Sequence, residues 1–431
     1  MRKLLPLFLV SLLVSTTVNA QTRLNRTEKK IIEKVASYES NAIAFLEKVV
    51  NINSGTLNKK GVRKVGDVFA LEFENIGFKT QWIDMPEEMN RAGHLFASIH
   101  GDRGKKLLLI GHLDTVFEEN SPFQRFERIN DSMAHAPGGN DMKGGDVVVL
   151  YALKALSDLN LLKNADITVA FTGDEESTGK PLSISRKALI DAGKKADIAL
   201  GFENATGYNN ATIARRGASG WKVESRGVRA HSSGVFRPKV GAGAIFEMSR
   251  VLHRFYEEVR GEELLTFNPG TLLGGTFVTY DPQTSSGNVF GKTNVVAQKA
   301  VVNGGLRFIS EAQKERARNK MREIVAEPLP QTQSSISFVD SYPAMGPSEG
   351  NKAVLEQLSQ VSQAMGQGSV TAYDPAKRGA ADISFVADYT DGIDGLGTMG
   401  KAAHTPEETV NLKTMNTLIQ RTAVLIYRLT R

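Results

Sequence analysis

A short aliphatic run that ends in two metal-type side chains constrains the fold of this chain most. Residues 107–110 read Leu-Leu-Leu-Ile, and Gly111, His112, Leu113 and Asp114 follow. Four consecutive aliphatic residues bounded by a glycine predict a central strand of a parallel sheet, buried on both faces. In open α/β sheets the chemistry gathers at the carboxyl edge of such strands, so His112 is predicted to be a metal ligand.

The spacing of His112 and Asp114 fits a metal-bound histidine. A carboxylate two residues further on can accept the second ring N–H of the imidazole and so fix its tautomer and orientation. The alternative is a polar loop that holds a histidine by chance, because short motifs have a high false-positive rate. The other acidic residues along the chain provide the evidence that distinguishes these two interpretations.

Composition places the chain among globular proteins of two or three domains. It has 431 residues, of which 41% are hydrophobic, and a formal net charge of +6. The basic residues are interspersed with acidic ones, and no block of lysine or arginine occurs. We therefore expect no nucleic-acid partner.

The first 20 residues have the three parts of a secretory signal peptide. Arg2 and Lys3 are basic, residues 4–14 are mainly apolar, and a segment that fits a cleavage site ends at Ala20. We expect a mature start at Gln21, a periplasmic or secreted protein, and no membrane anchor once the leader is removed. An uncleaved anchor is the alternative, but the apolar run is short for a bilayer. The chain has no cysteine, which excludes disulfides and a lipid-modified cysteine.

Hydrophobic periodicity predicts an α/β fold with a discontinuous catalytic domain and an inserted module. Strands alternate with helices at first, which predicts a mainly parallel sheet flanked by helices. The pattern then changes to several strands and two helices, typical of a separate antiparallel α+β module. After a proline-containing linker at residues 327–330 the first pattern resumes. The predicted parts are a signal peptide at 1–20, a catalytic domain at 21–212 and 329–431, and the inserted module at 213–328.

The same periodicity predicts where the individual elements begin and end. In the first catalytic segment we expect helix 25–51, helix 65–76, strands 95–99 and 107–110, helix 146–159, strand 167–171, helix 184–192 and strand 198–202. Beyond it we expect strand 221–225, helix 241–259, strands 272–278, 295–302 and 306–309, helix 311–325, and a last helix at 409–429.

Four further sites in the chain carry candidate metal ligands. Three of them have carboxylates at the ends of predicted strands or in a turn, and the fourth has a histidine in a late loop. Asp141 lies in a glycine-rich turn without phosphate-binding spacing, where the alternative is a carboxylate at a helix N-terminus. Residues 174–176 read Asp-Glu-Glu directly after a predicted strand. Three adjacent acids repel one another unless cations are present, although a solvated acidic loop is the alternative. Glu203 ends another aliphatic strand, and His404 lies in a small-residue loop before the last helix.

Together these positions predict a centre for two metal ions. With one bridging carboxylate, each metal would receive one histidine and one terminal carboxylate. Nitrogen and oxygen ligands without thiolate favour two zinc ions, with cobalt or manganese as alternatives. Glu175 adjoins a ligand and is the natural general base for hydrolysis. The candidate ligands are His112, Asp141, Glu176, Glu203 and His404.

The order of these motifs resembles the di-zinc metallopeptidase family twenty. The resemblance spans His112-x-Asp114, Asp141-Met-Lys-Gly-Gly, the acidic triplet at 174–176, Glu203 and His404, which cover most of the chain. Within the family, the secreted glutamate carboxypeptidase (carboxypeptidase G) branch is most similar, because this chain also starts with a leader and carries a related segment at residues 51–56.

The resemblance implies a role for each motif residue. It implies that Glu175 is the acid/base, that Asp114 orients His112, and that the Asp141–Met142 bond is cis. The implied ligand sets are Asp141 as the bridge, His112 and Glu203 on one metal, and Glu176 and His404 on the other.

The resemblance extends to positions that bind the substrate. His231 resembles a family histidine that binds the developing oxyanion, with a solvated surface histidine as the alternative. Asn294 and Arg307 fall where the family holds substrate-binding groups, and a guanidinium fork fits a terminal carboxylate. A surface charge on a strand is the alternative for Arg307.

Two loops depart from the family pattern. Residues 378–382 read Arg-Gly-Ala-Ala-Asp instead of a longer glycine run, so Arg378 and Gly379 are expected to bind substrate in a narrower pocket. Gly139 and Asn140 replace an arginine and small residues that are more common before the bridging aspartate. The remaining histidines match no motif and are expected to be structural or exposed: His94, His100, His135 and His253.

These observations favour an exported di-zinc exopeptidase. It would remove a C-terminal amino acid, with glutamate as a candidate, from a peptide or an N-acyl conjugate. An N-acyl-amino-acid amidohydrolase or dipeptidase is the alternative hydrolase, and a non-catalytic periplasmic binding protein is the alternative of another class. Inserted modules of this family often mediate homodimerisation, so we expect a homodimer through the inserted module, with helix 241–259 as the candidate surface.

Overall fold

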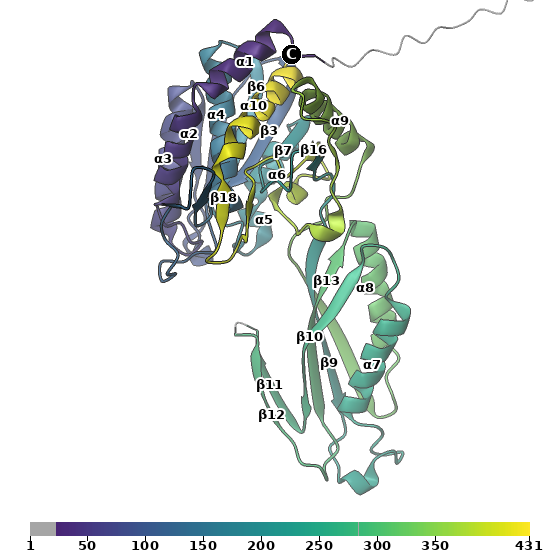
Figure 1. Cartoon of the computed structure of the whole chain (residues 1–431). Helices are drawn as coiled ribbons and strands as arrows, with labels where there is room; N and C mark the ends of the chain where they lie inside the picture. The colour runs from purple at the N-terminus through teal and green to yellow at the C-terminus, as the bar shows by residue number, and fades with distance from the viewer. Residues whose placement is uncertain (1–22, 283) are drawn as a thin grey trace, which may run out of the picture.

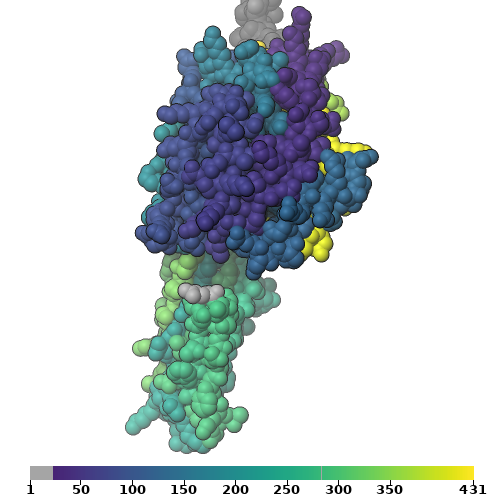
Figure 2. Space-filling model, turned by 90° about the vertical axis from the view of Figure 1, so that its left-hand side faces the viewer, coloured from purple at the N-terminus to yellow at the C-terminus, as the bar shows by residue number. Residues whose placement is uncertain are grey.

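The computed structural model describes residues 23–282 and 284–431, so the predicted signal peptide lies outside the described residues. The described chain forms an α/β domain, which contains the C-terminus, and an elongated module that extends from it (Figure 1). Figure 2 shows the same division from another side, with the inserted module below the α/β domain. Among the described helices, none has both the length and the apolar character needed to cross a membrane.

The α/β domain is built on a six-stranded sheet in the order β1-β2-β6-β3-β7-β16. The strands β6, β3, β7 and β16 pair in parallel with one another. At one edge of the sheet, β2 pairs antiparallel with β6, and β1 pairs antiparallel with β2. The mainly parallel sheet with a central β3 agrees with the predicted fold class. The strand bounds are β1 (Lys79–Ile83), β2 (His94–Ile99), β3 (Arg103–His112), β6 (Ala165–Thr172), β7 (Ile198–Gly201) and β16 (Asp391–Ile393).

Alternate side chains of β3 face two separate hydrophobic cores, as expected of a central strand. Leu107 and Leu109 pack in the larger core, which the first four helices and the last two share with the sheet. Leu108 and Ile110 pack in a smaller core on the other face, with residues of α6 and of the short helix η5 (Asp382–Phe385). The helices of the domain are α1 (Arg26–Ala36), α2 (Glu39–Val50), α3 (Lys59–Asn75), α4 (Gly144–Asp158), α5 (Leu182–Ser185), α6 (Lys187–Gly193), α9 (Glu349–Ala364) and α10 (Leu412–Leu429).

The predicted helix at residues 25–51 is in fact two helices. The break falls at Ser37, whose hydroxyl donates to the Lys34 carbonyl oxygen at 2.6 Å. Such a side-chain bond offers the backbone an alternative to continuing the helix. Helix α3 in turn begins earlier than predicted, because the Asn58 side chain caps it by accepting the Gly61 N–H at 3.0 Å.

The inserted module is an antiparallel sheet with two helices packed against it, as predicted. Its strand order is β10-β13-β9-β14, and its core lies between this sheet and the two helices. A separate two-stranded hairpin leaves the sheet after β10. The bounds are β9 (Gly217–Gly227), α7 (Ala244–Glu258), β10 (Thr266–Gly275), β11 (Phe277–Asp281), β12 (Ser286–Phe290), β13 (Lys299–Phe308), α8 (Glu311–Val325) and β14 (Thr332–Asp340).

Three details of the module differ from the prediction. The expected strand 272–278 is the end of β10 and the start of β11, which belong to different sheets. The two expected strands 295–302 and 306–309 form the single strand β13, which runs through Gly304 and Gly305. Gly304 does not break the strand but makes room for the ring of Trp221, since a Cβ there would lie 2.3 Å from that ring. Strand β14 pairs with β9 over residues 332–340, so the module's sheet continues past the predicted boundary at residue 328. The prolines that suggested a linker form a turn before β14, in which the Thr332 hydroxyl donates to the Leu329 carbonyl.

Two adjacent chain segments join the module to the α/β domain. Arg215 and Met345 exchange two backbone hydrogen bonds of 2.8 and 3.0 Å, just before β9 and just after β14.

A small sheet on the α/β domain, in the order β17-β18-β5-β4, carries the late loop around His404. The short strands are β4 (Glu127–Arg128), β5 (Met133–His135), β8 (Asn210–Ala211), β15 (Thr371–Ala372), β17 (Gly400–Lys401) and β18 (Thr409–Asn411).

Candidate metal centre

The five predicted metal ligands come from five separate places in the chain and meet at the carboxyl edge of the sheet. Each is a strand end or a loop that follows one: His112 ends β3, Asp141 lies in the turn before α4, Glu176 follows β6, Glu203 follows β7, and His404 lies between β17 and β18. They form two groups, and within each group the ligand atoms all lie within 4.8 Å of one another. One group is His112, Asp141 and Glu203, and the other is Asp141, Glu176 and His404. Asp141 is common to both groups.

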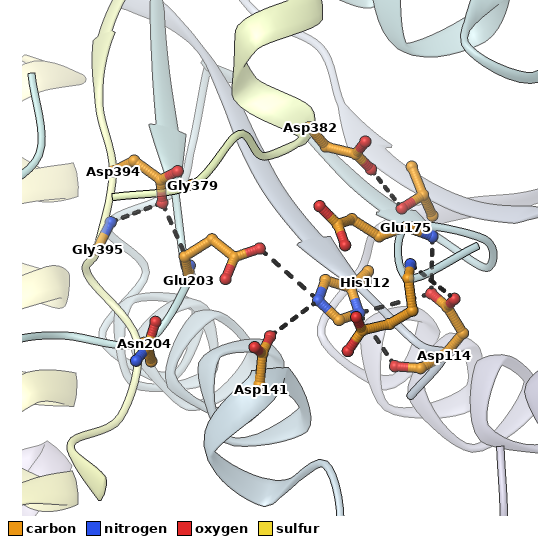
Figure 3. A network of polar contacts seen from close by, with 12 residues as sticks. His112, Asp114, Asp141, Glu175, Glu203, Asn204, Gly379, Asp382, Asp394 and Gly395 are labelled. Atoms are coloured by element: carbon orange, nitrogen blue, oxygen red, sulfur yellow. Dashed lines mark hydrogen bonds and ion pairs between the residues drawn. The ribbon is translucent and has the colours of Figure 1, made fainter. Parts of the chain in front are cut away.

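The two carboxylate oxygens of Asp141 face different histidines. Its Oδ1 lies 3.3 Å from Nε2 of His112, which is also 3.7 Å from a Glu203 oxygen (Figure 3). Its Oδ2 lies 3.0 Å from Nε2 of His404, which is also 3.2 Å from a Glu176 oxygen. One aspartate between two histidine–carboxylate pairs is the arrangement expected of a bridged pair of metal ions. The Asp141–Met142 bond is cis, as the resemblance implied.

The electrostatics of these residues fit divalent cations. Burial and the neighbouring Asp141 carboxylate raise the pKa of Glu203 to about 8. Burial likewise raises the pKa of Glu176, whose buried Oε1 has no hydrogen-bond partner. Hydrogen bonds to Asp141 and Glu176 raise the pKa of His404 to about 11, so without a cation a proton takes the place between these acids. Divalent ions would balance this negative charge, and the nitrogen and oxygen donors suit zinc.

Asp114 holds the centre in two ways. The Nδ1 atom of His112 lies 3.0 Å from the main-chain oxygen of Asp114 and 3.5 Å from its carboxylate, so the carbonyl is the closer orienting group. The carboxylate itself accepts the N–H groups of Glu175 and Glu176 at 3.0 and 3.1 Å and the Thr56 hydroxyl at 2.6 Å. Asp114 therefore positions the acidic loop as well as the imidazole, and the second task was not predicted.

Glu175 lies beside the metal ligands with a free carboxylate. Figure 3 shows it close to His112, and its side chain makes no hydrogen bond or ion pair with any of the residues that the structure describes. Burial raises the pKa of Glu175 well above its usual value, although His112 opposes the shift. A carboxyl group that binds a proton readily and is not tied to another side chain suits acid/base chemistry.

Sequence reasoning missed two acids that support the ligands. The buried Glu408 accepts the N–H groups of Asn140 and Asp141 at 2.9 and 3.2 Å, which ties the His404 loop to the turn that holds Asp141. The buried Asp394 accepts the Glu203 N–H at 3.3 Å and Nε of Arg215 at 2.7 Å. Nothing local separates Glu408 from the exposed Glu407 next to it.

The predicted substrate-binding residues fall into three places. Arg378 is buried beside the centre, where its guanidinium donates to the side-chain oxygen of Asn204 at 3.0 Å, and Gly379 accepts from Arg215 at 2.8 Å. Arg307 is exposed on β13, opposite Ala218 at the end of the module that adjoins the α/β domain.

His231 and Asn294 lie together at the other end of the module. Ser232 N–H donates to the Asn294 carbonyl at 2.9 Å, and among the residues described the exposed His231 ring forms hydrogen bonds only with Ser233. The 11 residues of β9 lead from the α/β domain to this end, a rise of roughly 30 Å. Within one chain, the structure does not bring these two residues to the metal centre.

The other histidines do not belong to either metal group among the described residues. His94 is buried, with Nε2 at 2.8 Å from the Ser185 carbonyl oxygen, and its Nδ1 accepts the Gly173 N–H at 3.1 Å. It therefore supports the loop that leads to the acidic triplet. His100 and His253 are exposed.

A mainly parallel sheet with two histidine–carboxylate groups joined by one aspartate defines the class of metal-dependent hydrolases with a two-metal site. Residues 108–428 match the model of the peptidase family M20/M25/M40, and the chain belongs to this family. It is accordingly a metallopeptidase.

Known proteins with similar sequences or folds agree with this assignment. The chain is 26% identical to carboxypeptidase G2 of Pseudomonas sp. (strain RS-16) over 399 residues, which cover 92% of this chain and 91% of that protein. The fold is similar to that of aminopeptidase PepT from Bacillus cereus ATCC 10987, with a TM-score of 0.72, 17% identity, and 91% and 99% of the two chains covered. It is also similar to Bacillus subtilis YXEP, described as a dinuclear metal-binding peptidase of this family, with a TM-score of 0.63, 13% identity, and 92% and 99% covered.

Proposed function

We propose that the chain is an exported two-metal exopeptidase that removes a C-terminal amino acid from a peptide or an N-acyl conjugate. The observation that carries the proposal is the pair of Asp141 oxygens, each facing its own histidine and carboxylate, with the free Glu175 carboxylate beside them. Similarity to carboxypeptidase G2 over 92% of the chain supports release from the C-terminal side. Glutamate is the first leaving amino acid to test.

Each group in the centre has a proposed task. Two zinc ions, with cobalt or manganese as alternatives, would be held by the two ligand groups and would supply Lewis-acid activation of water and of the scissile carbonyl. Glu175 takes the proton of the attacking water and delivers it to the leaving nitrogen. Asp114 keeps His112 and the acidic loop in place, and Arg378 and Arg307 provide guanidinium groups for a substrate carboxylate.

The experiment that tests this function combines metal analysis with a Glu175→Gln variant. We expect about two metal ions per chain in both proteins, and turnover at least about 10²-fold lower in the variant, the usual range for a lost acid/base group. Turnover is measured on dipeptides, N-acetyl and N-benzoyl amino acids, and folate-type conjugates. Glu119→Gln changes an exposed glutamate in the same way and serves as the control.

The outcomes separate the alternatives. Preference for N-acyl amino acids or dipeptides would indicate an amidohydrolase or a dipeptidase with the same chemistry. Full turnover in Glu175→Gln would reject the general base. Metal-loaded protein that binds peptides tightly but hydrolyses none of the panel would indicate a non-catalytic binding protein.

The proposal also includes export of the protein from the cytoplasm and formation of a homodimer. The leader-like residues 1–20 support a periplasmic or secreted protein, which N-terminal sequencing of exported protein would show as a start at Gln21. We also propose a homodimer through the inserted module. Helix α7 exposes Ile245 and Phe246, and the ring of Phe246 lies 5.6 Å from that of the exposed Phe236. Because His231 lies far from the metal centre of its own chain, its predicted role requires a second copy or a large rotation of the module.

A further inference from the structure

Tyr342 lies where the inserted module rejoins the α/β domain. It follows β14 by two residues, in the second of the two connecting segments. Its carbonyl oxygen accepts the N–H of Ala218 at 2.8 Å, and Ser341 N–H donates to the Ala218 carbonyl at 3.2 Å. The backbone of Tyr342 is therefore tied to the start of β9 in the inserted module, so that its position follows the orientation of the module.

The hydroxyl of Tyr342 reaches the acidic loop at residues 174–176. It donates to the main-chain carbonyl of Glu175 at 2.7 Å. It also lies 3.4 Å from Nη2 of Arg186 and 3.0 Å from the Thr178 hydroxyl. Because the guanidinium can only donate and the carbonyl can only accept, the direction of the Tyr342 hydrogen bond to Glu175 is determined.

The α/β side of this contact is rigid. Arg186 is fully buried and pairs with Asp174 and Asp382, the latter with Nε 2.8 Å from Oδ1. The ring of Tyr342 packs on that of Phe385, with centroids 5.0 Å apart. The hydroxyl is thus held against the loop both by ring packing and by a buried ion-pair cluster.

Glu175 depends on its backbone for its direction. Its carboxylate has no hydrogen-bonding partner in the described part of the chain, so no side-chain hydrogen bond fixes its direction and the position of the main chain matters more. That main chain is held at two points. The N–H donates to Asp114 at 3.0 Å, and the C=O accepts from Tyr342.

We propose that Tyr342 is a positioning residue that aims the Glu175 carboxylate and couples it to the orientation of the inserted module. The proposal rests on the proposed function of Glu175 as the general base. A rotation of the module about the connecting segments moves Tyr342 and, through its hydroxyl, the peptide unit of Glu175. The base is therefore aimed only in those orientations of the module that keep this hydrogen bond.

The test is a Tyr342→Phe variant of the full-length, metal-loaded protein. Phenylalanine keeps the ring packing on Phe385 and removes only the hydroxyl. We expect kcat to fall about tenfold, the lower end of the range for lost supporting hydrogen bonds at metal sites. KM, the content of two metals and the Tm should stay close to those of the wild type. Amide hydrogen exchange of the peptide that contains Glu175 and Glu176 should become faster, because one of its two anchors is lost.

Two matched variants separate the hydroxyl from general packing. Tyr389→Phe removes the hydroxyl of an exposed tyrosine on the same domain and should leave kcat unchanged. Phe385→Leu removes the ring contact that helps to hold the Tyr342 hydroxyl, and should lower both the Tm and kcat, whereas Tyr342→Phe should lower kcat alone. A Tyr342→Phe variant whose Tm falls while its kcat is kept, or whose exchange and kcat are both unchanged, would overturn the proposal.

A double variant distinguishes failure of this proposal from failure of the proposed function. If Tyr342 acts through Glu175, Tyr342→Phe should change turnover by less than about twofold in a Glu175→Gln background, because residues that act as a unit are non-additive. A further tenfold loss in that background would show that Tyr342 acts elsewhere. If Glu175→Gln alone keeps full turnover, the general base itself is wrong and the positioning role falls with it.

Discussion

At the scale of single residues, the three neighbouring acids at positions 174–176 have three different surroundings. Glu176 faces His404, Glu175 keeps a free carboxylate, and Asp174 is buried against Arg186. Burial acts to raise the pKa of Asp174, but Arg186 and His94 outweigh it and lower the pKa to about 2. Acidic residues at adjacent positions thus differ in role, because each side chain has different contacts.

The buried Asp174 predicts a pH dependence of stability. Its folded-state pKa lies below the ordinary value of 3.8, so the unfolded chain binds more protons between these two values. The carboxylate therefore stabilises the fold fully above that ordinary value, and this contribution is lost as the pH falls towards 2. We expect Asp174→Asn to be less stable than the wild type at pH 7, by about 2 kcal/mol, and the difference to shrink in acid.

Urea unfolding of both proteins between pH 3 and pH 7 measures this difference. Asp191→Asn changes an aspartate whose partner Lys187 lies on the surface, and its effect should be small. A stability difference for Asp174→Asn that stays constant as the pH is lowered would contradict the assignment.

At the scale of elements, local capping chemistry determines where the first helix begins. The Asn25 side chain accepts the Glu28 N–H at 2.9 Å, and Glu28 accepts the Asn25 N–H at 2.8 Å. This reciprocal capping box satisfies two N–H groups that a helix start leaves without partners. Glu28 also binds Arg428 of α10 at 2.8 Å, so the cap is joined to the last helix of the chain.

Replacement of the cap should weaken the fold without affecting catalysis. We expect Asn25→Ala to lower the free energy of unfolding by about 1 kcal/mol, the usual cost of a lost N-cap. The single variant Asn25→Asp should keep the free energy of unfolding of the wild type, because aspartate caps a helix equally well. Urea unfolding gives the stability, and kcat/KM should match the wild type. Lys29→Ala, at an exposed position of the same helix, is the control, and an equal loss in that variant would exclude a capping effect.

At the scale of the whole molecule, the chain is two bodies with separate hydrophobic cores joined by two short segments. The core between the module's sheet and its helices does not merge with the cores on the two faces of the large sheet. The candidate metal ligands all belong to the α/β domain, whereas His231 and Asn294 belong to the far end of the module. The two connecting segments, which pair through Arg215 and Met345, therefore set the position of the module relative to the candidate metal centre.

The exposed apolar side chains of the module predict the oligomeric state. Phe246 is 55% exposed on α7, and exposed apolar groups that cluster on one surface mark protein contacts. We expect the wild type to sediment as a dimer, and Phe246→Glu to sediment as a monomer with an unchanged circular dichroism spectrum. Leu71→Glu introduces the same charge at a residue of α3 that is 57% exposed, and it should remain dimeric. A wild type that is monomeric at micromolar concentration would exclude this surface as a stable interface.

Much of the fold and the ligand set could be predicted, since both depend on local patterns. The aliphatic run before His112 specifies a strand that is buried on both faces, and that strand places the imidazole at the sheet edge. The break at Ser37 and the length of β13 could not be predicted, because they depend on one hydroxyl bond and on the room that Gly304 leaves for Trp221.

The amino-acid sequence by itself determined which side chains are available to bind metals and in what order they occur, because strand ends and glycine turns are local features. Only the tertiary structure decided which acids hold those ligands. Glu408 bonds to a turn 268 residues away in the sequence, and Tyr342 reaches Glu175 across 167 residues. Hydrogen bonds depend on distances in space, and chain spacing does not specify such distances once the segments belong to different elements.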